Sequence, residues 1–381
     1  MTTSNMDFQQ KCLELRKAKG GLWETALKVK VENQDDLSTV YTPGIAAPCR
    51  AIAKDPALAR VLTQKRNTVA VISDGSAVLG LGNIGPQASL PVMEGKCMLL
   101  KAFADVDAMP IVLDTQDTEE IIRTIIHMAP TFGGINLEDI AAPRCFEIEA
   151  RLTKALDIPV FHDDQHGTAM VALAALKNAL KVVGKSKTSI KVVIAGAGAA
   201  GMATAKLWQA WGIGNIIMTD SKGIIDCDRE ELSDPKKAFC TYQEGTIKEA
   251  LVGADVFIGL SNKPDMLDRE MVRSMNPEPI IFAMANPDPE ILPPEAKAGG
   301  AAIIATGRSD FPNQINNVLI FPGLFRGLLD AGITKIDTAL KLRVAEGLAD
   351  IVEHPTAEYI IPSAFDKNVV KVVSQAVIYQ K

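Results

Sequence analysis

Two pairs of adjacent carboxylates follow segments that have the pattern of buried strands. Glu138 and Asp139 close GGINLED, and Asp163 and Asp164 close VFHDD one βα unit later. Because the carboxyl ends of neighbouring parallel strands converge on one crevice, we expect these acids to lie close together. Crowded carboxylates repel one another unless a cation neutralises them, and oxygen ligands select Mg²⁺ or Mn²⁺. The pattern predicts a divalent metal site, with helix N-caps or solvated loop ends as the alternative.

A zinc site is a second interpretation of the same segment. His162 and His166 have the i, i+4 spacing of the His-Glu-x-x-His motif, which requires a continuous helix. Pro159 before them and Gly167 after them favour a strand end followed by a loop. The spacing therefore does not support a zinc prediction.

Two further residues are candidates for acid and base chemistry. On a helix, Lys96 would lie on the same side as Met93 and Leu100, where partial burial would lower its pKa toward the working pH. A lysine whose ammonium reaches the surface is the alternative. Tyr41 in VYTPG is the second candidate, and it too has an alternative, because a lone tyrosine before a turn is usually structural.

Two segments match the pattern Gly-x-Gly-x-x-Gly, at residues 78–87 and 193–202. A dinucleotide site also needs a preceding strand, a helix that opens on the glycines and an acid about 20 residues later. The second segment supplies all three, since the strand NIIMTD ends at Asp220. The residues expected to bind the dinucleotide are Gly196, Ala197, Gly198, Ala199, Ala200, Gly201 and Asp220.

The first glycine pattern lacks this context. Pro86 follows its last glycine and Pro91 comes soon after, so we expect no helix to open directly on Gly85 and assign the pattern to a loop. At the second pattern, Asp220 favours NAD because its carboxylate would repel a 2′-phosphate. Lys222, two residues later, keeps NADP as the alternative.

The elements that would position these residues alternate between strand and helix. Apolar runs such as TVAVISDG, MPIVLD and IPVFHDD are separated by helical patterns, and a second series begins at KVVIAGAG. This alternation is typical of parallel βαβ units, and 381 residues exceed what one hydrophobic core supports. We predict an α/β fold with an N-terminal α/β substrate domain (1–165). A C-terminal Rossmann-type domain with a doubly wound parallel sheet and closing helices would span 166–381.

Composition narrows the class of protein. A net charge of −6 gives no basic footprint for nucleic acid or an anionic membrane. The longest uncharged run, Val192 to Ala205, is shorter than a membrane span, and the first residues contain no long apolar stretch. Six cysteines without a Cys-x-x-Cys pair favour reduced, mostly buried thiols. We therefore expect a soluble cytoplasmic protein that acts on small molecules.

Together these motifs resemble the malic enzyme family, in particular its short bacterial form. The resemblance runs through nearly the whole chain, and its blocks stand in the family's order: YTPGIAAPC, SDGSAVLGLGNIGPQASLPVMEGK, GGINLEDI, FHDDQHGTA, AGAGAAG, FAMANPDPEI and ATGRSDFPNQINNVLIFPG. Longer relatives carry a phosphate-acetyltransferase-like domain after this point, so we expect no control by acetyl-CoA through such a domain.

The resemblance implies a role for each candidate. Lys96 would be the general base that takes the malate hydroxyl proton, assisted by Asp163, and Tyr41 the acid that protonates the enol. The first glycine pattern would belong to the substrate-domain loop ahead of Lys96. The implied metal ligands are Glu138, Asp139 and Asp164, and the implied substrate-carboxylate ligands are Asn286 and Asn317.

One position departs from the family's pattern. Large malic enzymes carry an arginine shortly after the Asp-Gly of the first strand, where it grips a substrate carboxylate, and here that segment has Ala77. Arg50 and Lys101 are the candidate substitutes. A homodimer is expected from the family and from the frequency of twofold assemblies.

The implied reaction is the oxidative decarboxylation of L-malate to pyruvate and CO₂, with NAD or NADP and with Mn²⁺ or Mg²⁺. Malolactic chemistry would use the same residues but retain the cofactor and release lactate. A metal-independent amino-acid dehydrogenase would leave the paired carboxylates without a role. A nucleotide-sensing protein without catalysis would leave both these acids and Lys96 unexplained.

Overall fold

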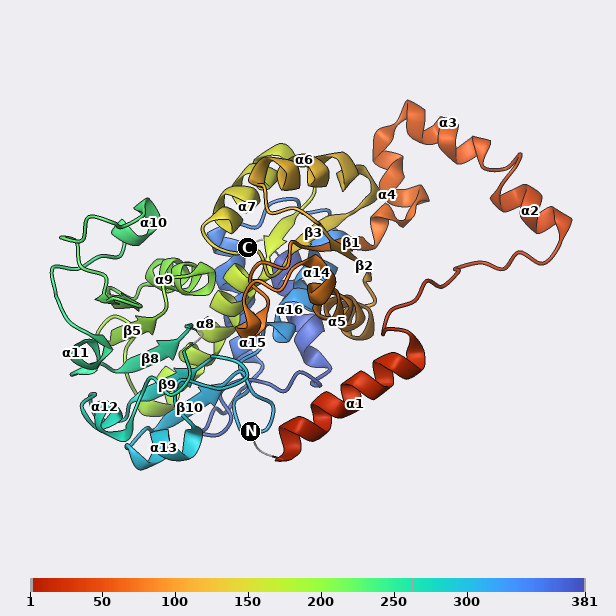
Figure 1. The fold of residues 1–381 in the computed structure, drawn as a ribbon. Helices are drawn as coiled ribbons and strands as arrows, with labels where there is room; N and C mark the ends of the chain where they lie inside the picture. Colours follow the sequence, from red (N-terminus) through yellow and green to blue (C-terminus); the bar gives the residue numbers. More distant parts are fainter. Residues whose placement is uncertain (1–2, 262, 380–381) are drawn as a thin grey trace.

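The computed structural model describes residues 3–261 and 263–379 and contains two mostly parallel sheets (Figure 1). The first sheet has the order β2-β1-β3-β4, with every pair parallel. Its strands and the helices that follow them are β1 (Thr68–Ser73), α5 (Pro86–Ala104), β2 (Asp107–Val112), α6 (Thr118–Met128), β3 (Gly134–Leu137), α7 (Arg144–Ala155) and β4 (Val160–His162).

Alternation along β1 explains how this sheet is covered on both faces. Val69 and Val71 pack in the core shared with α5, whereas Ala70 and Ile72 pack in the core formed with α6 and α7. Successive side chains of a strand point to opposite faces, so a strand buried on both faces is continuously apolar. All six residues of β1 are buried accordingly.

The second sheet has the order β10-β9-β8-β5-β6-β7, parallel except for the β6–β7 pair. Its strands are β5 (Lys191–Ala195), β6 (Asn215–Asp220), β7 (Gly223–Ile224), β8 (Val256–Gly259), β9 (Ile280–Ala283) and β10 (Ile303–Thr306). The helices of this region are α9 (Ala199–Trp211), α10 (Asp234–Lys237), α11 (Ile247–Leu251), α12 (Arg269–Arg273) and α13 (Pro293–Ala298). The order, with connections leaving β5 in both directions, is that of a doubly wound Rossmann-type sheet, which confirms the predicted fold class.

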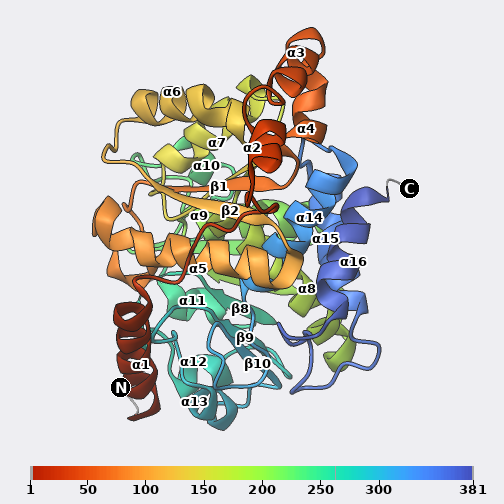
Figure 2. The ribbon, with the colours of Figure 1, turned by 90° about the vertical axis from the view of Figure 1, so that its right-hand side faces the viewer.

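A long helix, α8 (Asp163–Val183), lies between the sheets and is buried along most of its length. Beside it pack α14 (Phe321–Ala331), α15 (Thr338–Asp350) and α16 (Asn368–Ile378), which form the closing layer seen in Figure 2. The predicted division between residues 165 and 166 falls in the first turn of α8 and stays a prediction. Among the described residues, no helix is both long and apolar enough to cross a membrane.

The N-terminal residues form an arm that projects from this body (Figure 1). Its helices are α1 (Thr3–Lys19), α2 (Gln34–Val40), α3 (Ala46–Lys54) and α4 (Ala59–Leu62). Within α2, α3 and α4, all in the described part of the chain, no residue is buried. Apolar side chains on the arm are instead exposed, including Leu27, Val29, Val40, Ile45 and Val61. Isolated helices this short are marginal in water, so the arm lacks the packing that usually stabilises such helices.

The cysteines differ from the expectation of reduced, mostly buried thiols. Cys227 and Cys240 form a disulfide, Cys97 and Cys145 are buried, and Cys12 and Cys49 are exposed. The chain after β7 folds back so that the amide of Cys227 donates to the carbonyl of Thr241 at 2.9 Å. That backbone pairing brings the two sulfurs together, although their spacing of 13 positions matches no local motif.

Candidate active site

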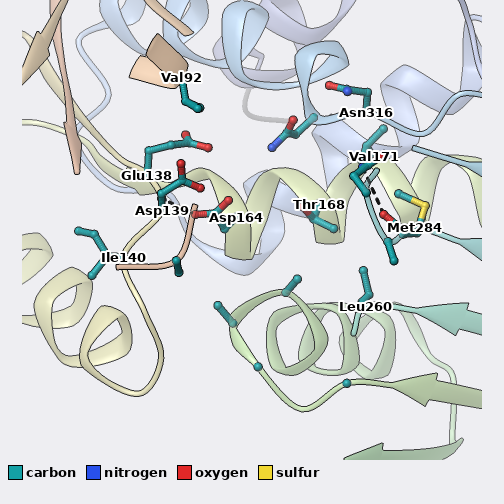
Figure 3. Close-up of a pocket in the computed structure, with 18 of the residues that line it drawn as sticks. Val92, Glu138, Asp139, Ile140, Asp164, Thr168, Val171, Leu260, Met284 and Asn316 are labelled. Carbon is teal, nitrogen blue, oxygen red and sulfur yellow. Dashed lines mark hydrogen bonds between the residues drawn. The ribbon is translucent and has the colours of Figure 1, made fainter. Parts of the chain in front are cut away.

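A cavity of about 780 Å³ lies between the two sheets, at the carboxyl ends of their strands (Figure 3). Ligands of open α/β sheets bind at this edge. Acids that follow the first sheet form one wall, and the loops after β5, β8 and β9 form the opposite wall. The sequence-predicted residues that line it are Lys96, Glu138, Asp139, Asp164, Gly196, Gly198, Ala199, Ala200, Asn286 and Asn317.

Three of the predicted carboxylates converge in this cavity. Glu138, Asp139 and Asp164 each offer an oxygen within 4.8 Å of the others, and the first two are buried. Asp139 has φ +54°, a left-handed conformation that Asp tolerates, and its amide donates to Asp164 Oδ2 at 2.8 Å. Asn136 Nδ2 donates to Glu138 Oε2 at 2.9 Å. The backbone therefore holds acids from β3 and α8 against one another.

The electrostatics of this cluster call for a positive charge. Burial, opposed by Lys96 and reinforced by Asp164, raises the pKa of Glu138 to about 7. Burial also raises the pKa of Asp164 to about 6, again against the effect of Lys96. Carboxylates with raised pKa values release protons when a cation binds, so the donor set fits a divalent ion that prefers oxygen.

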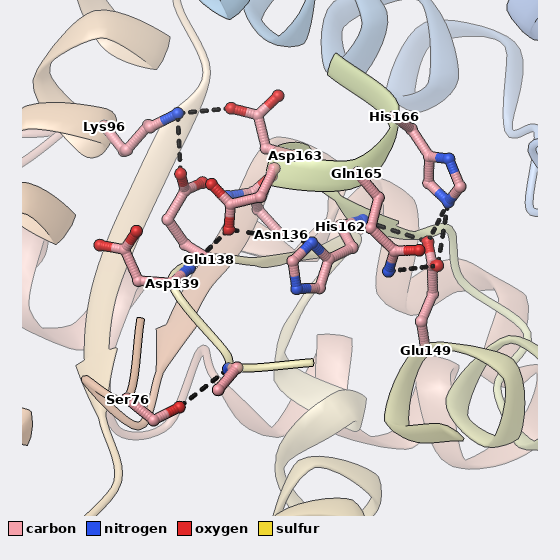
Figure 4. Close-up of polar contacts among 12 residues, drawn as sticks. Ser76, Lys96, Asn136, Glu138, Asp139, Glu149, His162, Asp163, Gln165 and His166 are labelled. Atoms are coloured by element: carbon pink, nitrogen blue, oxygen red, sulfur yellow. Dashed lines mark hydrogen bonds and ion pairs between the residues drawn. The ribbon is translucent and has the colours of Figure 1, made fainter. Parts of the chain in front are cut away.

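Lys96 lies between two of the predicted acids (Figure 4). Its Nζ donates to Asp163 Oδ2 and is 3.0 Å from Glu138 Oε1, and the ammonium lies 4.6 Å from the ring centroid of Phe321. The prediction of a lowered pKa was wrong. Burial alone would lower the pKa of Lys96, but the charges of Asp163 and Glu138 outweigh burial and raise it.

Asp163, the first residue of α8, is fully buried, and its carboxyl folds back over the helix. Burial raises the pKa of Asp163 to about 7, against the opposing effect of Lys96. Gly167 makes this position possible, because a Cβ at that residue would lie 1.9 Å from Asp163 Oδ1 and 3.0 Å from the Cβ of Asn317. Sequence reasoning missed Gly167 as a site residue and interpreted it only as a sign of a loop.

The segment from Asp163 to Gly167 is helical, which corrects the expectation of a loop. α8 begins at Asp163 and continues through Gly167, with His162 as its N-cap residue. Two acids in the first turn stabilise a helix N-terminus, and this effect outweighs the low helix propensity of one glycine. His166 Nε2 lies 2.9 Å from Glu149 Oε2, and burial lowers the pKa of His162 to about 4. Within the described residues, the candidate metal cluster contains carboxylates and neither histidine.

The second glycine pattern forms the turn from β5 to α9. Gly196 has φ +112°, and a Cβ there would lie 2.4 Å from the carbonyl oxygen of Leu260. A Cβ on Gly201 would lie 1.8 Å from the carbonyl oxygen of Gly196, so the helix can approach the turn only with glycine. Gly198 is the N-cap of α9. The positive end of this helix therefore opens on the cavity, the arrangement that binds pyrophosphate.

Asp220 ends β6 as predicted, but its carboxylate is already engaged. Arg229 donates to both of its oxygens at 3.0 and 2.9 Å, and Lys236 donates at 2.7 Å. Burial would raise the pKa of Asp220, but the hydrogen bonds from these cations outweigh it and lower the pKa. Lys222, the cation noticed in the sequence, pairs with Glu231 at 2.8 Å instead. Arg229 and Lys236 gave no recognisable signal in the sequence because they follow β7, outside the local unit of strand, glycines and helix, with Lys236 on α10.

The first glycine pattern lies in the loop between β1 and α5, outside the residues that line the cavity. The expectation that no helix opens on Gly85 was wrong, because α5 begins at Pro86 with Gly85 as its N-cap. Proline suits the first helical position, where no amide donor is needed. A Cβ on Gly80 would lie 2.5 Å from the carbonyl oxygen of Asn286. This loop therefore packs closely against Asn286, the candidate substrate ligand that follows β9.

Both halves of the chain match family models, described as "Malic enzyme, N-terminal domain" over residues 21–153 and "Malic enzyme, NAD binding domain" over residues 165–380. The chain belongs to the malic enzyme family. The resemblance carried by the sequence motifs is therefore confirmed.

Several malic enzymes are similar over most of this chain. A bifunctional malic/malolactic enzyme of Bacillus subtilis is 52% identical over 98% of this chain and 92% of its own length. An NAD-dependent malic enzyme of Geobacillus stearothermophilus is 55% identical, covering 94% of this chain and 76% of its own. The crystal structure of an NAD-dependent malic enzyme from Thermotoga maritima superposes with a TM-score of 0.93 at 47% identity, covering 96% and 98% of the two chains.

Membership of the malic enzyme family bears on the alternatives drawn from the sequence. It counts against an amino-acid dehydrogenase, and a nucleotide sensor would leave the carboxylates and Lys96 that line the cavity without a role.

Tyr41, the candidate acid, does not line the cavity of its own chain. Tyr41 follows α2 on the projecting arm, and 61% of it is exposed. Arg50, a candidate for the missing substrate-binding arginine, lies on α3 of the same arm. Lys101 pairs with Asp107 at 2.8 Å and lies outside the cavity lining. Among the described lining residues, Lys96 is the only lysine or arginine.

Proposed function

We propose that this chain catalyses the oxidative decarboxylation of L-malate to pyruvate and CO₂, with reduction of NAD or NADP and dependence on Mn²⁺ or Mg²⁺. The observation that carries the proposal is a single cavity that joins a carboxylate cluster and a buried lysine to a glycine turn at a helix N-terminus. Hydride transfer needs the dinucleotide beside the substrate, and both proton transfer and loss of CO₂ need charge stabilisation there.

Glu138, Asp139 and Asp164 would hold the metal ion. Their converging carboxylate oxygens match the oxygen preference of Mg²⁺ and Mn²⁺, and burial disfavours their negative charges without a cation. When bound, a divalent ion there supplies Lewis-acid polarisation to the oxygen on the substrate carbon that is oxidised.

Lys96 acts as the base in this proposal, with Asp163 as its proton acceptor. The ammonium of Lys96 cannot take a proton, so its own proton passes to Asp163 as Nζ accepts the proton of the malate hydroxyl. Two features support the transfer: the two side chains are hydrogen-bonded, and the pKa of Asp163 is about 7. An acceptor with a pKa near the working pH is suited to this role.

The remaining groups of the cavity orient the reactants. The turn at Gly196 and the first amides of α9 bind the dinucleotide phosphates. Asn286, which follows β9, and Asn317, at the start of the short helix η5 (Asn317–Leu319), would donate hydrogen bonds to the substrate carboxylates. A nicotinamide bound there would accept the hydride of the substrate carbon. Loss of CO₂ from the resulting 2-oxo acid leaves an enolate, which becomes pyruvate when an acid, for which Tyr41 is the candidate, protonates its carbon.

The first test is a coupled assay on the purified protein. L-Malate is incubated with NAD or NADP, with Mn²⁺ or a chelator, and absorbance of the reduced nicotinamide is followed while pyruvate and lactate are assayed. We expect metal-dependent formation of NADH or NADPH matched by pyruvate. Absence of any product with either dinucleotide would overturn the proposal.

Malolactic decarboxylation is the second candidate, favoured by the name of the Bacillus subtilis relative. It uses the same metal, base and substrate contacts, but the hydride returns to the 2-oxo product before the dinucleotide leaves. Lactate formed without free reduced nicotinamide would assign the chain to this reaction.

The proposed dinucleotide is NAD, with NADP as the alternative. Asp220 at the end of β6 supports NAD. Its ion pairs with Arg229 and Lys236 offset the carboxylate charge that would repel a 2′-phosphate, which keeps NADP in consideration. The relatives fit either outcome, because a malic enzyme of Escherichia coli that is 47% identical over 90% of this chain, and 48% of its own length, is named NADP-dependent.

We also propose a homodimer in which the arm of one chain packs on the other. Helices α2 to α4 bury none of their residues, although their apolar side chains need a partner. The same arm carries Tyr41, the candidate acid, and Arg50, a candidate carboxylate ligand, neither of which lines the cavity of its own chain. A second copy would receive both. The cytoplasmic location stays a prediction, because the Cys227–Cys240 disulfide removes the argument from free thiols.

Asp164→Ala is expected to abolish the Mn²⁺-dependent activity. The change removes a ligand and the acceptor that holds the amide of Asp139 in place. Loss of a supporting contact alone weakens metal affinity by about 10- to 100-fold, and loss of a direct ligand should weaken it at least as much. Binding of Mn²⁺, followed by electron paramagnetic resonance, should weaken together with turnover. An unchanged Mn²⁺ affinity would show that the ligand set is wrong.

Gly167→Ala is expected to lower kcat by about 100-fold, because a misplacement of about 1 Å at a catalytic group costs that much. The added methyl would lie 1.9 Å from Asp163 Oδ1, so the carboxyl must leave Lys96. Gly214→Ala is the matched control, since a Cβ there meets nothing within 4 Å. Kinetics and thermal unfolding of both variants check the prediction, and full activity of folded Gly167→Ala would refute the proposed role of Asp163.

A further inference from the structure

A second cavity, of about 270 Å³, lies beside the first turn of α8. Asp164 lines the first cavity, whereas the next two residues, Gln165 and His166, line the second and point toward Glu149 of α7 (Figure 4). Its other walls come from α9 and α15. Its apolar lining residues are Phe146, Ala169, Met202, Ala203, Leu207 and Ala210.

Two lysines of this cavity form no direct ion pair among the residues that the structure describes, although Glu149 and Asp337 act on one of them, Lys341, from a greater distance. Lys206 of α9 and Lys341 of α15 both line it, and neither forms an ion pair with any residue that the structure describes. Lys341 Nζ instead lies 3.1 Å from the Nδ1 of His166. Burial lowers the pKa of Lys341. The charges of Glu149 and Asp337 oppose this effect, and the like charge of Lys206 adds to it. An anion between the two ammonium groups would relieve both effects.

The two nearest carboxylates, Glu149, which itself lines the cavity, and Asp337, accept hydrogen bonds from other donors. Glu149 accepts hydrogen bonds from the amide of His162 at 3.2 Å and from Gln165 at 3.1 Å, besides its contact with His166. Asp337, the N-cap of α15, accepts from the amide of Leu340 at 2.7 Å. The cavity therefore has a cationic end and an apolar wall.

We propose that this cavity binds a small organic carboxylate, with its carboxylate between Lys206 and Lys341 and its apolar body against Met202 and Leu207. Charge-assisted hydrogen bonds are about twice as strong as neutral ones, and the apolar wall selects against a fully hydrated anion. Small-molecule sites commonly have this combination of an apolar lining and a few convergent polar groups.

The occupant would contact the two helices that begin at the first cavity. α8 starts with Asp163 and Asp164, and α9 starts at the glycine turn. A ligand bound between these helices is therefore placed to act on metal and dinucleotide binding together. Such coupling is reciprocal, so either ligand would change the affinity for the carboxylate.

The test is calorimetric titration of the full-length protein, saturated with Mn²⁺ and NAD, at constant ionic strength. Butyrate is the probe, butyramide its uncharged counterpart, and inorganic phosphate an anion without an apolar body. We expect saturable binding of butyrate only. Lys341→Met and Lys206→Met should each weaken it by roughly tenfold or more, the loss of one charge-assisted hydrogen bond. Lys335→Met, on an exposed lysine outside the cavity, is the control.

The variants also separate this site from the first cavity. Butyrate bound in the first cavity would bind equally well to Lys341→Met, and that result would overturn the proposal. Absence of saturable binding to the unaltered protein would overturn it as well, and phosphate binding as tightly as butyrate would exclude an organic carboxylate as the ligand class. Because Lys206 is exposed, its variant should fold even if Lys341→Met does not. Turnover of malate is not part of the readout, so failure here leaves the proposed reaction untouched.

Discussion

Lys96→Ala is expected to lower kcat for malate oxidation by about 10³-fold or more, the contribution of a well-placed general base. The side chain is the only amine that lines the cavity among the described residues, and it alone connects the substrate hydroxyl to Asp163 in the proposed reaction. Dinucleotide binding should be unchanged, because the glycine turn at Gly196 lies on the opposite wall. Single-turnover kinetics and the fluorescence of bound NADH measure the two properties separately.

The control for this variant is Lys154→Ala, on an exposed lysine of α7 outside the cavity lining. It should retain full activity. Removal of Lys96 leaves Glu138 and Asp163 without their buried cation, so thermal unfolding must be measured first. Normal turnover of a folded Lys96→Ala protein would show that another group is the base, and loss of NADH binding would show that the change acts on the fold rather than on proton transfer.

The convergence of the acids was predictable from the sequence because it follows from topology. Glu138 and Asp164 each come at the end of a segment with the pattern of a parallel strand, and β3 and β4 are neighbours in the sheet. Strand ends of one parallel sheet share an edge, so no long-range information was needed. The glycine turn was predictable for the same reason, since strand, glycines, helix and Asp220 all lie within one local unit.

The pKa of Lys96 was predicted in the wrong direction because its neighbours come from distant parts of the chain. Helical spacing correctly placed Met93 and Leu100 in the core beside it. Spacing contained no information on Asp163, 67 positions away, which reverses the effect of burial. Arg229 and Lys236 altered the environment of Asp220 in the same way.

The predicted helix boundaries were wrong where the prediction depended on the type of a single residue. Pro86 was interpreted as a barrier to a helix, although the first helical position accepts proline, and α5 starts there. Gly167 was interpreted as the start of a loop, although its missing side chain is what lets Asp163 fold over α8. In both cases the effect of the residue depends on where neighbouring groups lie in the fold, and a local sequence pattern does not show this.

Mixed dimers provide the sharpest test of the projecting arm. Tyr41→Phe should slow pyruvate formation more than hydride transfer, and Lys96→Ala should abolish oxidation, so each homodimer is inactive overall. If the arm places Tyr41 in the cavity of the other copy, a mixed dimer has one complete site. That site takes Lys96 from the Tyr41→Phe chain and Tyr41 from the Lys96→Ala chain. Random mixing in equal amounts should then restore about a quarter of the normal activity, because about half of the dimers are mixed and each has one working site of two.

The same experiment distinguishes the two arrangements of the arm. If Tyr41 serves its own chain, every site in a mixed dimer lacks one of the two groups, and mixing restores nothing. Mixtures of Lys96→Ala with Asp163→Ala are the control, because both residues lie in one site of one chain and should not complement. Subunit exchange must be shown by tagging the two variants differently and isolating the doubly tagged protein. Recovered activity in that fraction, absent from the control, requires that the exposed Tyr41 of one chain completes the cavity of the other.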